Sequence, residues 1–162
     1  MLIVSDTSPL NYLVLVDAVD TLPVLFAEIY IPPAVIEELG HQRSPDSVRN
    51  WAKNPPPWLQ IRSPHKVIEL LGLHRGEIEA IALAEELSAA VLLIDDRAGK
   101  RAATQRGIRV MGTLGILAQA AVRSLISVEQ TSIKLRQTNF RGRVELLQEL
   151  VDELRLRGTD SG

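Results

Sequence analysis

The chain contains no cysteine among its 162 residues. This excludes disulfide bonds, thiolate metal sites and a cysteine nucleophile, and it agrees with a reducing compartment. Aromatic residues make up only 4% of the chain, which leaves little ring surface for stacking nucleic-acid bases. No apolar run approaches the roughly 20 residues of a membrane-spanning helix, and no Lys/Arg-led apolar leader opens the sequence. We therefore expect a cytoplasmic protein that has no membrane partner.

Several well-known catalytic motifs are also missing. The sequence has neither a GxGxxG nor a GxxxxGK[ST] phosphate loop, and no Ser-His-Asp arrangement is indicated. Its histidines, His41, His65 and His74, show no HxH or HExxH spacing and fall in polar loops or at helix starts, so we interpret them as surface residues. Nucleotide-cofactor, zinc-protease and serine-hydrolase functions are therefore not indicated.

Strand-like and helix-like segments alternate along a chain that is long enough for one domain. The predicted strands are Leu2–Val4, Glu28–Ile31, Leu59–Ile61, Val91–Ile94 and Ile108–Met111. The predicted helices are Leu10–Val19, Ala34–Leu39, Ser47–Lys53, Pro64–Leu71, Glu77–Leu87, Ala98–Arg106, Thr113–Val122 and an amphipathic helix over Val144–Leu154. This alternation predicts a parallel sheet, which binds ligands at the carboxyl ends of its strands.

Acidic residues occur where the chain leaves a strand or enters a helix. They are Asp6 in IVSDTSPL, Glu38 in PPAVIEEL, Glu77 in HRGEIEAIALA and the pair Asp95-Asp96 in VLLIDDRAG. Carboxylates that converge from distant segments repel each other unless a cation lies among them. The pattern therefore predicts a metal site.

Helical phase separates neighbouring glutamates, because two residues span about 200° of a helix. Glu77 lies on a small apolar stripe with Ala80 and Ile81, so it is a better site candidate than Glu79. The same test favours Glu38 over Glu37. The alternative for Glu77 is a first-turn residue that stabilises the helix dipole.

The aspartates also have a structural alternative. Asp6 could be the N-cap of the first helix, although Ser8 could take that position instead. Asp95 or Asp96 could cap the helix that follows them, but a cap needs only one carboxylate. The sequence leaves open which of the two faces a metal.

Basic residues follow the acidic pair directly. The stretch from Arg97 to Val128 has no Asp or Glu, and it begins with Arg97, Lys100 and Arg101. Cations beside an acidic centre suit an enzyme that acts on phosphodiesters, and a solvated helix face is the alternative.

Four segments in order, DTSPL, PPAVIEEL, RGEIEAIALA and LLIDDRAGKRAATQRGIRVMGT, resemble the PIN domain in the prokaryotic subfamily related to VapC toxins. The match runs from about residue 2 to residue 125. It implies a three-layer α/β/α fold with a central parallel sheet, commonly in the order 3-2-1-4-5, and a C-terminal helical extension. We expect a nuclease domain over 1–126, the extension over 127–157 and a disordered tail over 158–162.

The resemblance further implies an endoribonuclease that depends on Mg²⁺ or Mn²⁺. Residue by residue, the catalytic and metal-binding acids fall on Asp6, Glu38, Glu77, Asp95 and Asp96, with Glu79 as an alternative to Glu77. The small polar position of the first motif falls on Ser8, and Arg97, Lys100 and Arg101 are placed to steer the RNA backbone. The subfamily implies the toxin of a type II toxin–antitoxin pair, a small antitoxin protein as partner, and a homodimer.

Two rival functions stay open at this point. The first is a catalytically weak or inactive PIN-like module that binds RNA or a partner protein. The second is a phosphatase of the haloacid dehalogenase type, but that family needs a second Asp two residues after the first, where this chain has Ser8.

Overall fold

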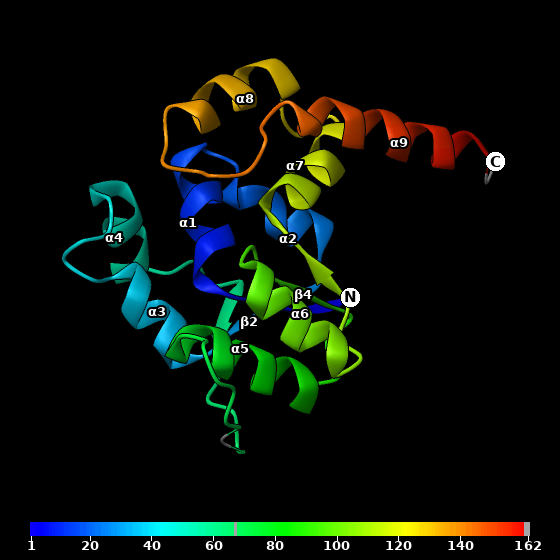
Figure 1. Ribbon diagram of the computed structural model, residues 1–162. Coiled ribbons are helices and arrows are strands. Elements are labelled where there is room, and N and C mark those ends of the chain that lie inside the picture. Colours follow the sequence, from blue (N-terminus) through cyan, green and yellow to red (C-terminus); the bar gives the residue numbers. More distant parts are fainter. Residues whose placement is uncertain (67, 161–162) are drawn as a thin grey trace.

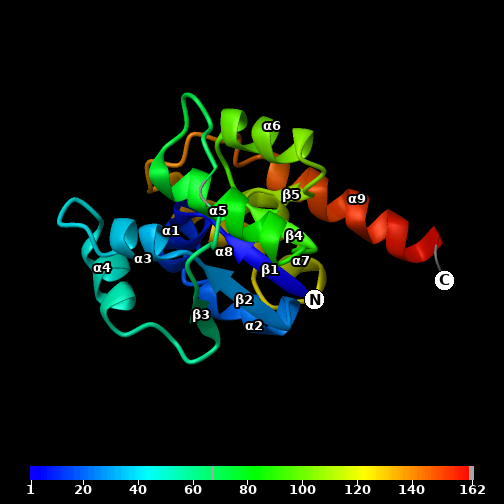
Figure 2. The same ribbon diagram turned by 90° about the horizontal axis from the view of Figure 1, so that it is seen from below.

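The computed structural model describes residues 1–66 and 68–160 of the chain. In this part, five strands form one parallel sheet in the order β3-β2-β1-β4-β5, and Figure 2 shows them as a row. The strands are β1 (Leu2–Ser5), β2 (Glu28–Ile31), β3 (Leu59–Ile61), β4 (Val91–Leu93) and β5 (Val110–Met111). The predicted sheet and its order are confirmed.

Helices connect the strands and cover both faces of the sheet. They are α1 (Thr7–Leu15), α2 (Leu22–Leu25), α3 (Pro33–Leu39), α4 (Asp46–Lys53), α5 (Arg75–Glu86), α6 (Arg97–Gln105), α7 (Thr113–Val122), α8 (Val128–Arg136) and α9 (Leu146–Asp160), with a 3-10 turn, η1 (Val19–Thr21). Figure 1 shows α5 below the strands and α7 above them. The three-layer α/β/α prediction is therefore confirmed.

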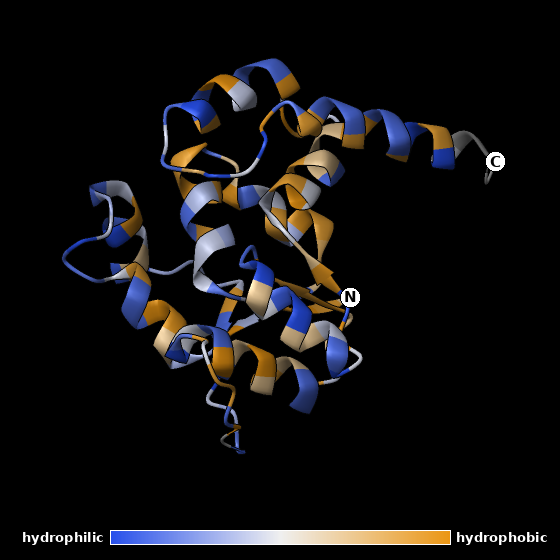
Figure 3. Ribbon diagram, in the orientation of Figure 1, coloured by the Kyte–Doolittle hydropathy of each residue, from blue (hydrophilic) through white to orange (hydrophobic). Residues whose placement is uncertain are grey.

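Strand alternation divides the hydrophobic core into two clusters, because successive side chains of a strand point to opposite faces. Ile3 and Leu93 pack with residues of α1, α3, α7 and α9. Val4 and Leu92 pack with residues of α5 and α6. Figure 3 shows the strands as a hydrophobic centre with hydrophilic residues on the outer faces of the helices.

The carboxyl ends of β1 and β4 lie side by side at one rim of the sheet. Ser5 is paired with Leu93, and the backbone N–H of Asp6 donates to the Leu93 carbonyl at 2.8 Å. After β1, the chain enters α1. After β4, it passes through Asp95 and Asp96 and enters α6. The rim therefore places the residues that follow these two strands next to each other.

Two helix predictions are wrong. No helix occupies the described residues of the predicted helix Pro64–Leu71, and residue 67 lies outside them. The backbone N–H of His65 donates to the Glu86 carboxylate at 2.8 Å, which fixes the segment across α5 in a nonhelical path. The first helix ends at Leu15 rather than Val19, because Asp17 adopts a positive φ of 58° that a right-handed helix does not allow.

The last two helices, α8 and α9, belong to the same core. Leu135, Leu147 and Val151 are buried with residues of α1 and α7, and Figure 1 shows the end of α9 projecting from the body. Helix α9 continues to Asp160, so the tail predicted to be disordered from residue 158 is helical as far as that residue. Residues 161 and 162 lie outside the described part. No helix of the described residues is long and apolar enough to cross a membrane.

We expect the Leu147→Ala substitution to destabilise the whole domain, because Leu147 is fully buried against α7. The free energy of unfolding should fall by about 2–5 kcal/mol in urea titrations. The matched control is Leu156→Ala on the same helix, whose side chain is 66% exposed and should change stability little. Equal effects of the two substitutions would show that α9 does not pack as described.

Candidate functional site

A cavity of about 640 Å³ opens at the carboxyl rim of the sheet, between the first turns of α1, α5 and α6 and the side of α3. Its lining residues are Asp6, Thr7, Ser8, Asn11, Glu38, His74, Arg75, Glu77 and Asp96. We call it the acidic cavity. It brings together Asp6, Ser8, Glu38 and Glu77, as the sequence predicted.

Asp6 lies at the base of the acidic cavity and is only 5% exposed. It stands at the N-cap position of α1, but its side chain makes no capping hydrogen bond, and its Oδ1 atom has no hydrogen-bond partner in the described part of the chain. Burial raises the pKa of Asp6 to about 7, opposed by the Thr7 amide and reinforced by the charges of Glu77 and Glu38. The cap alternative therefore does not account for this carboxylate.

Glu77 has one oxygen in a structural role and one without a partner. Its Oε1 accepts a hydrogen bond from the backbone N–H of His74 at 3.4 Å. For this atom, the alternative prediction of a residue that stabilises the first turn of the helix therefore holds. Its Oε2 is buried and unpaired among the described residues, and the side chain is 7% exposed. Burial, followed by the charge of Asp96, raises the pKa of Glu77. The second oxygen therefore lies buried close to Asp96, with no ion-pair partner among the described residues to neutralise its charge.

Glu38 is held against the start of α5. The Thr7 hydroxyl donates to its Oε2, and the Gly76 backbone N–H donates to its Oε1 at 3.2 Å. Glycine at position 76 allows this close contact, because a Cβ there would lie 2.8 Å from the Glu38 carboxyl carbon and would displace the carboxylate. Glu37 points away and is 62% exposed, as helical phase predicted.

The two adjacent aspartates serve different helices. Asp95 accepts hydrogen bonds from the backbone N–H and the hydroxyl of Thr113, both at 2.7 Å, and so anchors the start of α7. Asp96 accepts the Gly99 backbone N–H at 2.8 Å as the N-cap of α6, and it also lines the acidic cavity. Asp96 thus lies at the cavity, and Asp95 does not.

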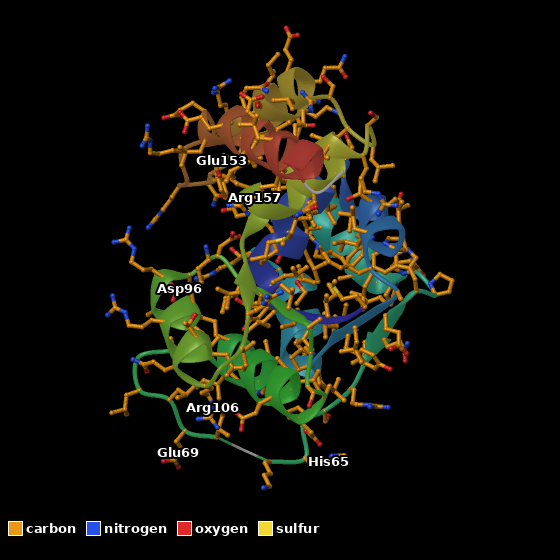
Figure 4. All side chains as sticks on the ribbon, turned by 90° about the vertical axis from the view of Figure 1, so that its right-hand side faces the viewer. His65, Glu69, Asp96, Arg106, Glu153 and Arg157 are labelled. Carbon is orange, nitrogen blue, oxygen red and sulfur yellow. The ribbon has the colours of Figure 1, made fainter. Side chains whose placement is uncertain are left out.

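The predicted RNA-steering cations do not line the acidic cavity. Arg97 and Arg101 are exposed on α6, whereas Lys100 is half-buried. Figure 4 shows Asp96 and Arg106 at opposite ends of this helix. The cation that does line the cavity is Arg75, at the first position of α5.

Sequence reasoning missed several residues of the site. Asn11 follows Thr7 by four positions, a spacing that places both on one face of α1, so helical phase could have identified it. His74 lines the cavity although it was interpreted as a surface residue. Gly99 lies directly against the site, since a Cβ there would lie 2.6 Å from Ile94 Cδ1 and 2.8 Å from Glu77 Oε2, and nothing in the sequence signals this contact.

The donor set of the cavity fits a hard divalent cation. The described residues contain no group of three or more His, Cys, Asp or Glu side chains placed to hold one ion. However, Asp6 Oδ1 and Glu77 Oε2 are buried carboxylate oxygens without partners. Carboxylate oxygens are the ligands that Mg²⁺ prefers, and this ion is commonly bound through one or two carboxylates and several waters.

A family model described as PIN domain matches residues 2–155, nearly the whole chain. The chain belongs to the PIN domain family. The fold is therefore of the nuclease type, and the resemblance found in the motifs is confirmed. Among curated proteins no match was found.

A solved structure supports the same fold. The chain is similar to a PilT N-terminus domain protein from the hyperthermophilic archaeon Sulfolobus solfataricus P2, with a TM-score of 0.54 and 18% sequence identity. The match covers 74% of this chain and 93% of the archaeal one. At this identity, the similarity shows the fold of the PIN domain and no more.

The raised pKa of Asp6 predicts a pH-dependent stability in the absence of divalent ions. A carboxyl group with a higher pKa in the folded chain favours folding when protonated, so its contribution is complete below about pH 4 and lost as the pH rises through about 7. Asp6→Asn should therefore be more stable than wild type at pH 8, on the order of a few kcal/mol, and the difference should vanish near pH 4.

Urea titrations in EDTA between pH 4 and pH 8 measure this effect. Asp20→Asn is the matched control, since Asp20 is exposed and lies outside the cavity. A difference between Asp6→Asn and wild type that does not change with pH would contradict the assignment of the raised pKa to Asp6.

Proposed function

We propose that this PIN domain is an endoribonuclease that depends on Mg²⁺ or Mn²⁺ and cleaves RNA phosphodiesters with a metal-activated water. The observation that carries the proposal is the pair of buried, unpaired oxygens, Asp6 Oδ1 and Glu77 Oε2, at the acidic cavity. Burying unpaired carboxylates is costly unless a cation or a proton neutralises them. Enzymes accept this free-energy cost in substrate-binding cavities, where such carboxylates take part in binding or catalysis.

In this proposal, the carboxylates have separate tasks. Asp6 and Glu77 offer their open oxygens as ligands, while Glu38 and Asp96 add negative charge from positions held by hydrogen bonds. A divalent ion bound there supplies an acidified water and neutralises charge on the phosphate. Asp95 keeps the rim in place through Thr113 and is not assigned a ligand role.

Cations near the cavity support a polyanionic substrate. Arg75 at the cavity wall is placed to contact a phosphate, and Ser8 and Asn11 offer neutral hydrogen-bonding groups. Arg97, Lys100 and Arg101 are proposed to steer the RNA backbone from α6, outside the cavity. Such contacts give binding that weakens with salt and reads little sequence.

The VapC-like motifs also support a biological role. We infer that the protein is the cytoplasmic toxin of a type II pair, neutralised by a small antitoxin protein, and that it forms a homodimer. Basic side chains of an antitoxin would complement the acidic cavity, whose lining includes the acids Asp6, Glu38, Glu77 and Asp96.

Purified protein should cleave single-stranded RNA with Mn²⁺ or Mg²⁺ and lose this activity in EDTA. Asp6→Asn and Glu77→Gln should each lower the cleavage rate by about 100-fold or more, because each removes a charged ligand worth several kcal/mol. The measurement is gel analysis of a labelled RNA under single-turnover conditions.

Glu85→Gln is the control, since Glu85 is on α5 but pairs with Arg106 away from the cavity. Its cleavage rate should equal that of wild type. Absence of metal-dependent cleavage by wild-type protein, or retained activity in Asp6→Asn, would instead favour the binding-module alternative.

A further inference from the structure

A loop of the C-terminal extension lies against α1 beside the acidic cavity. The loop joins α8 to α9 over residues 137–145, and Figure 1 shows it (orange) crossing α1. The Tyr12 hydroxyl donates to Asn139 Oδ1 at 2.9 Å, and the rings of Tyr12 and Phe140 meet edge to face with centroids 5.0 Å apart. Tyr12 follows Ser8 of the acidic cavity by four positions, so the two lie on one face of α1, about one helical turn apart.

Two charged groups of opposite sign act on the Tyr12 hydroxyl. Burial raises the pKa of Tyr12, the charge of Asp95 raises it further, and the charge of Arg141 lowers it. Because such effects weaken with distance, Asp95 and Arg141 both lie near this hydroxyl. The loop between α8 and α9 therefore carries a guanidinium group to the rim of the sheet beside Asp95.

Lys100 of α6 brings a second cation to Asp95. Its Nζ atom and Asp95 Oδ1 each lie 3.0 Å from the point that a Cβ of Gly112 would occupy, so the two atoms are no more than twice that distance apart. They form no ion pair, and the half-buried ammonium group has no hydrogen-bond partner in the described part of the chain. Asp95 is already satisfied without Lys100, because Thr113 donates to both of its oxygens.

The cations outnumber the acid in this group. The Arg141 side chain is exposed and, like that of Lys100, has no ion-pair or hydrogen-bond partner among the described residues. The next acid in the chain, Asp96, lines the acidic cavity, where the proposed divalent ion would balance its charge. Two unpaired cations around Asp95 leave a positive charge that a phosphate group can neutralise with charge-assisted hydrogen bonds.

We propose that Lys100 and Arg141 bind a phosphate group of the RNA strand next to the acidic cavity, a site that rests on the proposed ribonuclease function. A strand whose scissile phosphate lies at Asp6 and Glu77 would place a neighbouring phosphate one turn farther along α1, against these two cations. Contacts of this kind position a strand without reading its sequence. The C-terminal extension thereby takes part in binding the substrate, since it supplies Arg141.

The test is the affinity of the full chain for a short fluorescein-labelled single-stranded RNA, measured by fluorescence anisotropy in EDTA, which prevents metal-dependent cleavage. Lys100→Gln and Arg141→Gln should each weaken binding by about tenfold at low salt, because each removes one charge-assisted contact. Each should also reduce the slope of log K against log salt concentration by about 0.7, the value for one phosphate contact to a single strand.

Arg109→Gln is the matched control. It removes the same charge from an exposed side chain, but Arg109 precedes β5 and so lies at the opposite edge of the parallel sheet from the rim. It should leave the affinity and the salt slope close to those of wild type. Arg141→Lys keeps the charge and should keep the slope. Variants Lys100→Gln and Arg141→Gln that bind RNA as Arg109→Gln does would overturn the proposal.

The outcomes also separate this site from the nuclease proposal. RNA binding that depends on Lys100 and Arg141, without any metal-dependent cleavage, would support the site and reject the nuclease. Cleavage by wild-type protein, with RNA binding that neither variant weakens, would do the reverse. Wild-type protein that binds no RNA would overturn both.

Discussion

The constraint on which the structure depends is the crowding of negative charge at the carboxyl rim of a parallel sheet. Asp6, Glu38, Glu77 and Asp96 arrive from four different elements at one cavity, and two of them are almost fully buried. Loss of water on burial, and to a smaller extent repulsion by the neighbouring carboxylates, opposes ionisation there, which is why the pKa of Asp6 rises to about 7. The fold maintains this arrangement because local contacts offset part of its cost.

Those contacts come from the backbone at the starts of helices. The amides of His74, Gly76 and Gly99 donate to Glu77, Glu38 and Asp96, respectively. Helix starts have free N–H groups and a positive end, so they are suited to hold carboxylates. Two glycines let the acids lie against the backbone, since a Cβ at Gly76 would displace the Glu38 carboxylate and a Cβ at Gly99 would displace Ile94 and the Glu77 carboxylate. Among the described residues of this cavity, Asp6 Oδ1 and Glu77 Oε2 are the buried oxygens that still lack a hydrogen-bond partner.

The sequence predicted the sheet and most of the site because their signals are periodic. Alternating strands and helices determine which acids reach the rim, and helical phase correctly separates Glu38 from Glu37 and Glu77 from Glu79. The predicted helix Pro64–Leu71 failed because its backbone is held by Glu86, a contact between segments 21 residues apart. Such long-range contacts leave no local pattern.

The aspartate pair shows the same limit. Because one carboxylate is enough to cap a helix, the sequence predicted that the second would be available to a ligand. Instead, Asp95 holds the start of α7 and Asp96 holds the start of α6. The role of Asp95 depends on Thr113, which is 18 positions away. Chain order places the two acids together, and only the tertiary structure tells them apart.

Helix α5 lines two cavities. Its buried face carries Glu77 to the rim, and its other face carries Glu79 to a second cavity that Lys66 also lines, with Arg75 at the border between the two. The 200° between the two glutamates gives one helix two separate acidic positions.

The most direct test of the central claim is a crystal structure of the protein soaked with Mn²⁺ and measured at the manganese absorption edge. The account predicts an anomalous peak in the acidic cavity, with oxygens of Asp6 and Glu77 at about 2.0–2.6 Å from the ion. A fully soaked crystal with no peak there, or with a peak bound by Asp95 and Thr113 instead, would contradict it.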